Sequence, residues 1–327
     1  MFLAVTLLLL VTTSASAFPD VPPGHAYEAA ISALSDAGII GGYANGNFGL
    51  VDPVKRAQFA KMIVGTLDIT ANTSTETRFT DLGDPDAHGY PHIFVQTAFD
   101  NGITYGTNAA QSLFAPWNFI RRDQVVSMIV RGAANLFPGV LETPPAGAQS
   151  LFGEVPEPHG ANLRVAEHNS LLNDLIGLGP NWSVTQNATR GEVAQMLFNL
   201  LRKIKESQVW VNADGSGDYP TIEAAVASVA PGTTIHLGPG VFTLGQTLDV
   251  ERPVKLVGMG ITAPNHTQVT CRHGVMHVGP VDFYAEGIDF VSTGSNERID
   301  VVTATDATIN LEDCRVAGGV RYQDGLG

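Results

Sequence analysis

From Phe18 to about Ile204, apolar residues recur at intervals of three and four, the spacing of an amphipathic helix. One apolar stripe ends at Gly38, and a second follows the dipeptide Asp52-Pro53. The residues between the stripes are rich in Gly and Asn, so they predict a loop. The pattern therefore predicts a helix, a loop and a second helix whose core positions are Tyr27, Ala30, Ile31, Leu34, Phe59, Met62, Ile63 and Leu67.

This helix–loop–helix pattern occurs three times. Each copy opens with Phe, any residue, an acidic residue and an aliphatic residue. Its second helix starts at Arg, with Gln or Glu two positions later and Met six positions later. The Arg follows the Phe by 38, 43 and 38 residues. Such repetition indicates units that bury each other's apolar stripes. We expect units at 18–68, 79–137 and 152–204 and a linker at 138–151; the repeated residues are Phe18, Phe79, Phe152, Arg56, Arg122 and Arg190.

The pattern changes at residue 209, where short apolar segments separated by turns predict strands. One helix is expected at Thr221–Ala230, before strands at 234–237, 241–244, 247–250 and 254–257. The segment 283–290 is echoed 26 residues later at 309–316, which is a plausible coil length for a parallel β-helix. A β-sandwich is the alternative. The fold class is therefore multidomain, with an all-α part followed by an all-β part.

The first 17 residues have the pattern of a signal peptide. Phe2–Val11 is apolar except for Thr6, and Ala15-Ser16-Ala17 supplies a small-residue cleavage pattern. The run is shorter than the roughly 20 residues that span a bilayer. We therefore expect an exported protein without a transmembrane span.

Composition narrows the function classes. The 32 acidic and 18 basic residues give a net charge of −14, which disfavours nucleic acid as a partner. Two cysteines exclude a disulfide scaffold; Cys271 and Cys314 either pair after export or pack as small apolar residues. His273 and His277 lack a nearby third ligand, and no nucleotide or phosphate-loop motif occurs, so neither a metal nor a cofactor is expected.

The repeated segment resembles the S-layer homology family, in its Phe-x-acid-aliphatic openings, its Gly-Ile-Ile helix end, its Gly/Asn-rich loop and its Arg-led second helices. The resemblance implies a three-repeat all-α spindle at the cell wall or S-layer surface. In that family, grooves between repeats bind secondary cell-wall polysaccharide, often pyruvylated. The resemblance also implies polysaccharide-binding roles for these residues: Arg56, Arg122, Arg190, Tyr27 and Tyr90.

The chemistry of arginine suits such a ligand, because a pyruvate ketal presents a carboxylate that the planar guanidinium pairs with bidentately. The alternative is that each Arg binds a carboxylate or loop carbonyl within the repeats. The third unit departs most from the family pattern, since Asp174-Leu175-Ile176 stands where Gly-Ile-Ile is expected. Its groove is the weakest candidate for binding.

Residues 209–327 resemble the start of pectin-lyase-like right-handed parallel β-helices, especially pectin methylesterases. The matching segments include Asp214–Ala225, Gly238–Thr243 and Pro253–Gly258. The resemblance implies a capping helix and the first coils of the β-helix. We expect further coils beyond Gly327.

A catalytic site is not complete in this sequence. Gln323 and Asp324 fall where the methylesterases have a Gln and a general-acid Asp, but Gly325 replaces the usual Thr. We expect both to be turn residues. The main hypothesis is an anchored protein that displays its β-helix. The alternatives are an anchored carbohydrate-active enzyme, acting on extracellular polysaccharide and completed beyond the C-terminus, and a passive spacer or adhesin.

Overall fold

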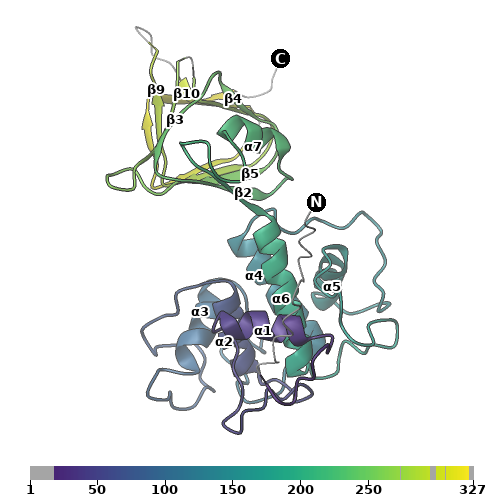
Figure 1. The fold of residues 1–327 in the computed structure, drawn as a ribbon. Coiled ribbons are helices and arrows are strands. Elements are labelled where there is room, and N and C mark those ends of the chain that lie inside the picture. The colour runs from purple at the N-terminus through teal and green to yellow at the C-terminus, as the bar shows by residue number, and fades with distance from the viewer. Residues whose placement is uncertain (1–17, 273, 295–299, 306, 324–327) are drawn as a thin grey trace, which may run out of the picture.

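In the part of the chain that the structure describes, six helices precede a parallel β-solenoid (Figure 1). The computed structural model describes residues 18–272, 274–294, 300–305 and 307–323. The expected signal peptide, residues 1–17, lies outside these ranges. None of the helices described is both long and apolar enough to cross a membrane.

The six helices form three consecutive pairs. The second helix of each pair begins at the arginine of the repeated motif, as the sequence predicted. The pairs are α1 (Glu28–Asp36) with α2 (Arg56–Thr66), α3 (His92–Asp100) with α4 (Arg122–Leu136), and α5 (His159–His168) with α6 (Arg190–Glu206).

The second helices meet at the centre, and the first helices pack outside them. α2, α4 and α6 contact one another, while α3 packs on α2, α5 on α4 and α1 on α6. Each outer helix therefore packs on the second helix of the preceding pair, and the order closes into a ring. The stripe residues fill one shared core, which includes Ile31, Leu34, Phe59, Ile63, Met128 and Leu197. No pair could bury its stripe alone, so the three pairs fold as one unit.

Short antiparallel bridges close the same ring where the second helices begin. Each bridge joins the segment before one arginine to the segment before another: Pro53 to Thr189, Lys55 to Phe119, and Arg121 to Asn187. The segments also exchange backbone hydrogen bonds, such as Val54 N–H to the Ala188 carbonyl. These bonds fix the three arginines close to a common axis.

The C-terminal part is a β-solenoid of about four turns, with parallel pairing throughout its three sheets. The first sheet has the order β1-β2-β5-β8-β11, the second β3-β6-β9-β12 and the third β4-β7-β10-β13. The strands are β1 (Gln208–Val211), β2 (Thr233–Leu237), β3 (Gly240–Thr243), β4 (Leu248–Val250), β5 (Val254–Val257), β6 (Thr267–Cys271), β7 (Met276–Val278), β8 (Phe283–Glu286), β9 (Asp289–Ser292), β10 (Asp300–Thr305), β11 (Ile309–Glu312), β12 (Arg315–Ala317) and β13 (Gly319–Gln323).

The 26-residue echo in the sequence is confirmed as one turn of this solenoid. Phe283 pairs with Ile309, and Phe290 pairs with Val316 in the neighbouring sheet. Parallel pairing of successive turns rules out the sandwich alternative. Buried aliphatic and aromatic residues such as Leu256, Ala285 and Phe290 stack inside the turns. The cysteines follow this packing: Cys271 is buried, Cys314 is partly buried, and no disulfide joins them.

Helix α7 (Ile222–Ser228) covers one end of the solenoid (Figure 1). It begins where the sequence predicted a helix, and the Thr221 hydroxyl accepts a hydrogen bond from the Ala224 N–H as an N-cap. Its apolar face, including Ile222 and Val226, belongs to the solenoid core. The helix therefore shields core residues that the first turn would otherwise expose.

The two parts join with almost no linker. One residue, Ser207, separates α6 from β1, and its carbonyl accepts a hydrogen bond from Thr234 N–H of β2. A second contact lies at the 138–151 linker, where a Cβ added to Gly139 would come within 2.6 Å of Gly232 Cα. Both glycines have positive φ, so the two backbones approach where side chains would not fit.

The sequence alignment of the third unit was wrong in one place. Ser170, not Asp174, occupies the position of Gly38 and Gly102, because all three have positive φ just after the first helix of a pair. The next residue in each case donates its N–H back into that helix; in the third unit, Leu171 donates to Ala166. Ser170-Leu171-Leu172 is therefore the counterpart of Gly-Ile-Ile.

Candidate functional site

Each of the three arginines reaches from its own helix into the loop of the next pair. Arg56 Nε donates to the Phe114 carbonyl at 2.8 Å, and Arg190 Nε donates to the Phe48 carbonyl at 2.7 Å. Arg122 Nη1 donates to the Ser183 carbonyl at 3.0 Å. The predicted structural alternative is therefore present for all three residues, while ligand contact stays a prediction.

The loops that receive Arg56 and Arg190 are held by an aspartate. Asp20 accepts hydrogen bonds from Phe48 N–H at 2.6 Å and Gly49 N–H at 2.7 Å, and Asp81 holds the equivalent loop of the second pair in the same way. Burial raises the pKa of Asp20, but the backbone N–H donors together lower it by more than burial raises it. The net shift of the pKa is therefore downward. The acid of the repeated opening motif is thus a loop-ordering residue.

The interface between the second and third pairs, which Arg122 and Glu192 share, carries an ion pair. Arg122 forms a two-point ion pair with Glu192, with 3.2 Å from Nε to Oε2 and 2.6 Å from Nη2 to Oε1. Trp182 Nε1 donates to the same carboxylate at 3.2 Å, and the Arg122 guanidinium lies over the Trp182 ring. Gln58 and Gln124 stand at the position of Glu192 in the other two pairs. A carboxylate therefore neutralises Arg122, whereas Arg56 donates to the Gln124 amide oxygen and Arg190 donates to backbone carbonyls.

Arg56 and Arg190 are almost fully buried, each with 5% of its surface exposed. Burial lowers the pKa of Arg56 to about 10, and Arg131 adds to this effect. Burial also lowers the pKa of Arg190, partly offset by Tyr43 and two nearby aspartates. A pKa of about 10 still leaves Arg56 charged at neutral pH.

A groove of about 660 Å³ lies between the first and second pairs. We call it the first groove. It is lined by the loop after α1, by α2, by the segment leading into α3 and by Arg190 from α6. Its polar and aromatic lining residues are Gln58, Lys61, Asp86, His88, Tyr90, Phe94 and Arg190.

The first groove brings together two of the predicted site residues, Arg190 and Tyr90. Arg190 Nη2 donates to the Gly41 carbonyl at 2.6 Å, which ties the arginine to the groove wall. Lys61 is exposed at the groove, and the sequence analysis did not single it out. Its position five residues after a motif arginine was the available signal, because Ser127 and Gln195 occupy that place in the other pairs.

Tyr27 is not the counterpart of Tyr90. Tyr27 is the residue immediately before α1, whereas Pro91 has that place before α3, so Tyr90 stands one position earlier. The Tyr27 ring is buried, its hydroxyl accepts a hydrogen bond from Ile176 N–H at 2.8 Å, and burial raises its pKa. These contacts give Tyr27 a packing role. Contact of Tyr27 with a ligand stays a prediction.

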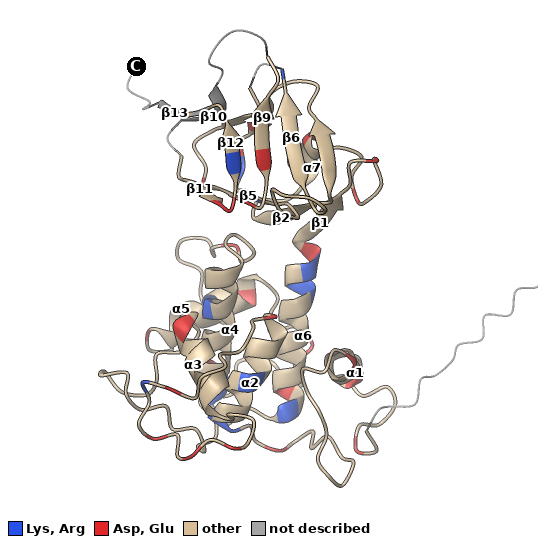
Figure 2. Cartoon of the chain, turned by 90° about the vertical axis from the view of Figure 1, so that its left-hand side faces the viewer, with Lys and Arg blue, Asp and Glu red and all other residues tan. Residues whose placement is uncertain are grey.

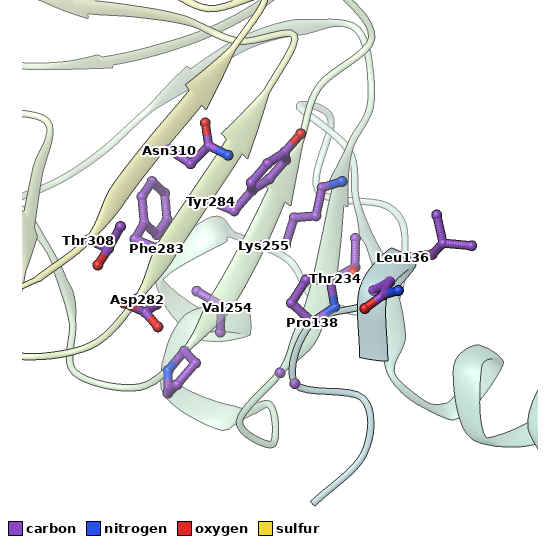
Figure 3. Close-up of a pocket in the computed structure, with 14 residues that line it drawn as sticks. Leu136, Pro138, Thr234, Val254, Lys255, Asp282, Phe283, Tyr284, Thr308 and Asn310 are labelled. Carbon is purple, nitrogen blue, oxygen red and sulfur yellow. The ribbon is translucent and has the colours of Figure 1, made fainter. Parts of the chain in front are cut away.

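A second cavity, of about 560 Å³, lies between the end of α4 and the outer face of the first solenoid sheet (Figure 3). Lys255 lies over the Tyr284 ring at 4.1 Å and pairs with Glu286 at 3.0 Å. The Tyr284 hydroxyl donates to Glu312. Lys255, Glu286 and Glu312 on this face therefore all have protein partners.

Charged groups on the second solenoid sheet also pair with each other, as the adjacent basic and acidic segments of β12 and β9 indicate (Figure 2). Asp289 is fully buried and accepts two hydrogen bonds from Arg315 and one from Gln268. Its pKa is lowered to about 2, mainly by Arg315 and against the effect of burial. This carboxyl cannot donate a proton at neutral pH. Of the weak catalytic candidates, Asp324 and the side chain of Gln323 lie outside the described residues.

The match of this chain to a known family model lies in the helical part. A family model described as "S-layer homology domain" matches residues 17–60. The chain is 27% identical over 190 residues to "S-layer protein" of Bacillus licheniformis and 26% identical over 190 residues to "S-layer protein EA1" of Bacillus anthracis. It is 31% identical over 107 residues to "Surface-layer 125 kDa protein" of Lysinibacillus sphaericus.

These similarities cover 57%, 57% and 33% of this chain, but only 20%, 20% and 8% of the three relatives. The chain therefore spans a fifth or less of their length. The matched residues 17–60 include α1, the loop held by Asp20 and the start of α2. The chain thus matches the S-layer homology model at residues 17–60, is similar over more than half its length to S-layer proteins, and has a β-solenoid in its C-terminal part.

Proposed function

We propose that this protein is exported and held at the cell surface by its helical part, which binds an anionic cell-wall polysaccharide. In this proposal, the three helix pairs are S-layer homology repeats, at residues 18–68, 79–137 and 152–204, and together they form one spindle. The observation that carries it is the first groove, where Arg190, Lys61 and Tyr90 lie together, in a chain whose residues 17–60 match the S-layer homology model.

The charge of the first groove suits an acidic glycan. Hydrogen bonds to Phe48 and Gly41 use the Nε and Nη2 atoms of Arg190. A guanidinium has five N–H donors, so donors remain for a carboxylate in the groove. Lys61 adds a second positive charge, while Asp86 is the one carboxylate in the lining. The overall charge of −14 does not oppose local binding, because screening limits surface charges to about 10 Å at 0.1 M salt.

The three predicted arginines have different prospects in this proposal. Arg190 lines the first groove and its partners are neutral. Arg56 also has neutral partners, the Phe114 carbonyl and Gln124. Arg122 already holds the Glu192 carboxylate, so an anionic ligand would have to compete with it. We propose a secondary cell-wall polysaccharide of the pyruvylated kind as the ligand, bound chiefly at Arg190.

The test is sedimentation of the purified protein with wall sacculi from the organism that encodes it. Intact sacculi should retain the protein, and sacculi stripped of polysaccharide by hydrofluoric acid should not. Equal retention by stripped peptidoglycan would contradict a polysaccharide ligand. High salt should weaken retention, because Lys61 is exposed at the groove and salt screens its attraction for an anionic ligand.

For the β-solenoid we propose display rather than catalysis. Two described carboxylates of the solenoid are engaged by protein partners: Asp289 pairs with Arg315, and Glu286 pairs with Lys255. Incubation with methyl-esterified and de-esterified pectin should release neither methanol nor unsaturated product. Turnover that Asp324→Ala abolished would instead support the anchored-enzyme alternative.

A further inference from the structure

Three aromatic rings continue from the first groove across the surface in a row. The Phe94 and Tyr90 ring centroids are 6.3 Å apart, and those of Tyr90 and Trp117 are 6.2 Å apart. A lysine lies over each end: Lys61 is 5.4 Å from the Phe94 centroid, and Lys55 is 5.6 Å from the Trp117 centroid. We call these five residues the aromatic ridge.

The aromatic ridge is joined to the first groove and then leaves it. Lys61, Phe94 and Tyr90 line the groove, whereas Trp117 and Lys55 do not. Trp117 is 49% exposed, so a large indole is held at the surface. Its side chain is not required for the core of the helical part, because it belongs to none of the buried clusters.

The near-threefold plan of the helical part shows what the fold requires at these positions. Trp117 stands five residues before Arg122, and the same places before Arg56 and Arg190 hold Val51 and Thr185. The counterparts of all five ridge residues at the interface of the second and third pairs are Arg121, Ser127, Glu157, Ala161 and Thr185. At the interface of the third and first pairs they are Thr189, Gln195, Ala26, Ala30 and Val51.

No aromatic side chain occurs at any of these counterpart positions, yet the same helix packing forms at all three interfaces. The Trp117 and Tyr90 rings are therefore not needed to build an interface, whereas Phe94 also packs against the helical core. Aromatic faces bury apolar area at low conformational cost, and lysines beside them attract anionic groups. This row is exposed at Trp117 and partly exposed at Tyr90 and Phe94, and it continues from a cationic groove. Such a surface matches a chain of sugar rings that carries negative charges.

We propose that the aromatic ridge is a second glycan subsite, which binds further saccharide units of the same anionic polysaccharide that occupies the first groove. This inference rests on the proposed function and extends it. The bound glycan would lie with one unit at Arg190, Lys61 and Tyr90 and with its next units on Trp117 beside Lys55. The affinity of the interface between the first and second pairs would then increase with glycan length. The other two interfaces lack the ridge, so their affinity would not depend on length in this way.

Calorimetric titration of the full chain with wall polysaccharide fragments of two sizes tests the inference. One fraction holds a single repeating unit, and the other holds several. Trp117→Ala should weaken binding of the longer fraction about tenfold, the value of one lost stacking contact of about 1.4 kcal/mol, and leave the single unit unchanged. Trp117→Phe should restore most of the affinity. Lys55→Gln should flatten the salt dependence for the longer fraction alone.

Val51→Ala and Thr185→Ala are the matched controls, because they change the same position at the other two interfaces. Neither should alter binding of either fraction. Equal affinity of Trp117→Ala and wild type for the longer fraction would overturn the ridge subsite while leaving the proposed anchor intact. If wild type bound neither fraction, the proposed function would fail and the ridge with it. Thermal melting of each variant separates lost binding from lost folding.

Discussion

Arg190 and Arg122 begin equivalent helices and enter equivalent loops, but their charges have different fates. Arg190 donates to two carbonyl oxygens and lines an open groove. Arg122 is held by the Glu192 carboxylate beneath Trp182. The residue two positions into the facing helix makes the difference, since it is Gln in two pairs and Glu in the third. The same position in the fold can thus hold an arginine with neutral partners or an arginine in an ion pair.

The largest effect is expected from Arg190→Ala. The substitution leaves the Phe48 and Gly41 carbonyls without their donor and removes the cation of the first groove. We expect the free energy of unfolding to fall by about 3 kcal/mol, because hydrogen bonds to charged groups contribute roughly 1.5–3 kcal/mol each. Urea denaturation measures this, and sedimentation with sacculi should show lost retention. Arg202→Ala, on the exposed side of the same helix, is the control, and equal effects would break the comparison.

Glu192→Gln would give the interface of the second and third pairs the glutamine that the other two interfaces have at this position. Arg122 would keep an amide acceptor but lose its counter-charge, so we expect a loss of about 2 kcal/mol in unfolding free energy, below the roughly 3–5 kcal/mol for removing a buried partner outright. Calorimetry should show an added or stronger site for the anionic fragments. A variant with wild-type stability and wild-type stoichiometry would mean that the ion pair does not close this interface.

The solenoid offers a pH test of a carboxylate that is permanently paired. The pKa of Asp289 is lowered to about 2, so its contribution to stability is present above its unfolded pKa near 3.9 and is lost as pH falls through about 2. Wild type should exceed Asp289→Asn by about 1–2 kcal/mol at pH 6, and the gap should close between about pH 4 and pH 2. Denaturation curves at four pH values measure this gap. A gap that stayed constant over that range would contradict the role of the ion pair with Arg315.

The smallest effect is expected from Lys61→Ser, which places the second pair's residue in the first. Lys61 is exposed, so unfolding free energy should change by no more than about 0.5 kcal/mol. Binding of wall fragments should weaken by about 1 kcal/mol at low salt, and the difference should shrink as salt is added. Lys205→Ser, at an exposed lysine in the last turn of α6 and away from the groove, is the matched control and should leave binding unchanged. A loss of affinity that was the same at low and high salt would argue against a charge contact at Lys61.

The sequence predicted most of the helical plan because each element there has a local signal. Arg56, Arg122 and Arg190 mark helix starts, and the apolar stripes mark the buried faces. The solenoid register also followed from a local echo between Phe283 and Ile309. Ser170 was missed because a residue other than glycine adopts positive φ there, and a search for glycine passes over it.

The site was predicted only in part, because it depends on contacts between distant segments. Lys61, Phe94 and Trp117 come from α2, α3 and the loop before α4, and no sequence interval links them. The partner of each arginine was likewise invisible, since Arg122 and Glu192 are 70 residues apart. Tyr27 and Tyr90 looked alike in sequence, but one position relative to the helix start separates a buried ring from a groove-lining one.

The junction between the two parts has a mechanical consequence. A force that pulls the solenoid away from the helices must pass through Ser207, because this single residue joins α6 to β1. No slack chain is available there to extend first, and the Ser207 carbonyl is already bonded to Thr234 N–H in the sheet. The backbone contact of Gly139 with Gly232 is non-covalent, so it limits tilting of the two parts and does not carry tension. Tension is therefore transmitted directly from α6 to the first solenoid sheet, and no flexible linker separates the two parts.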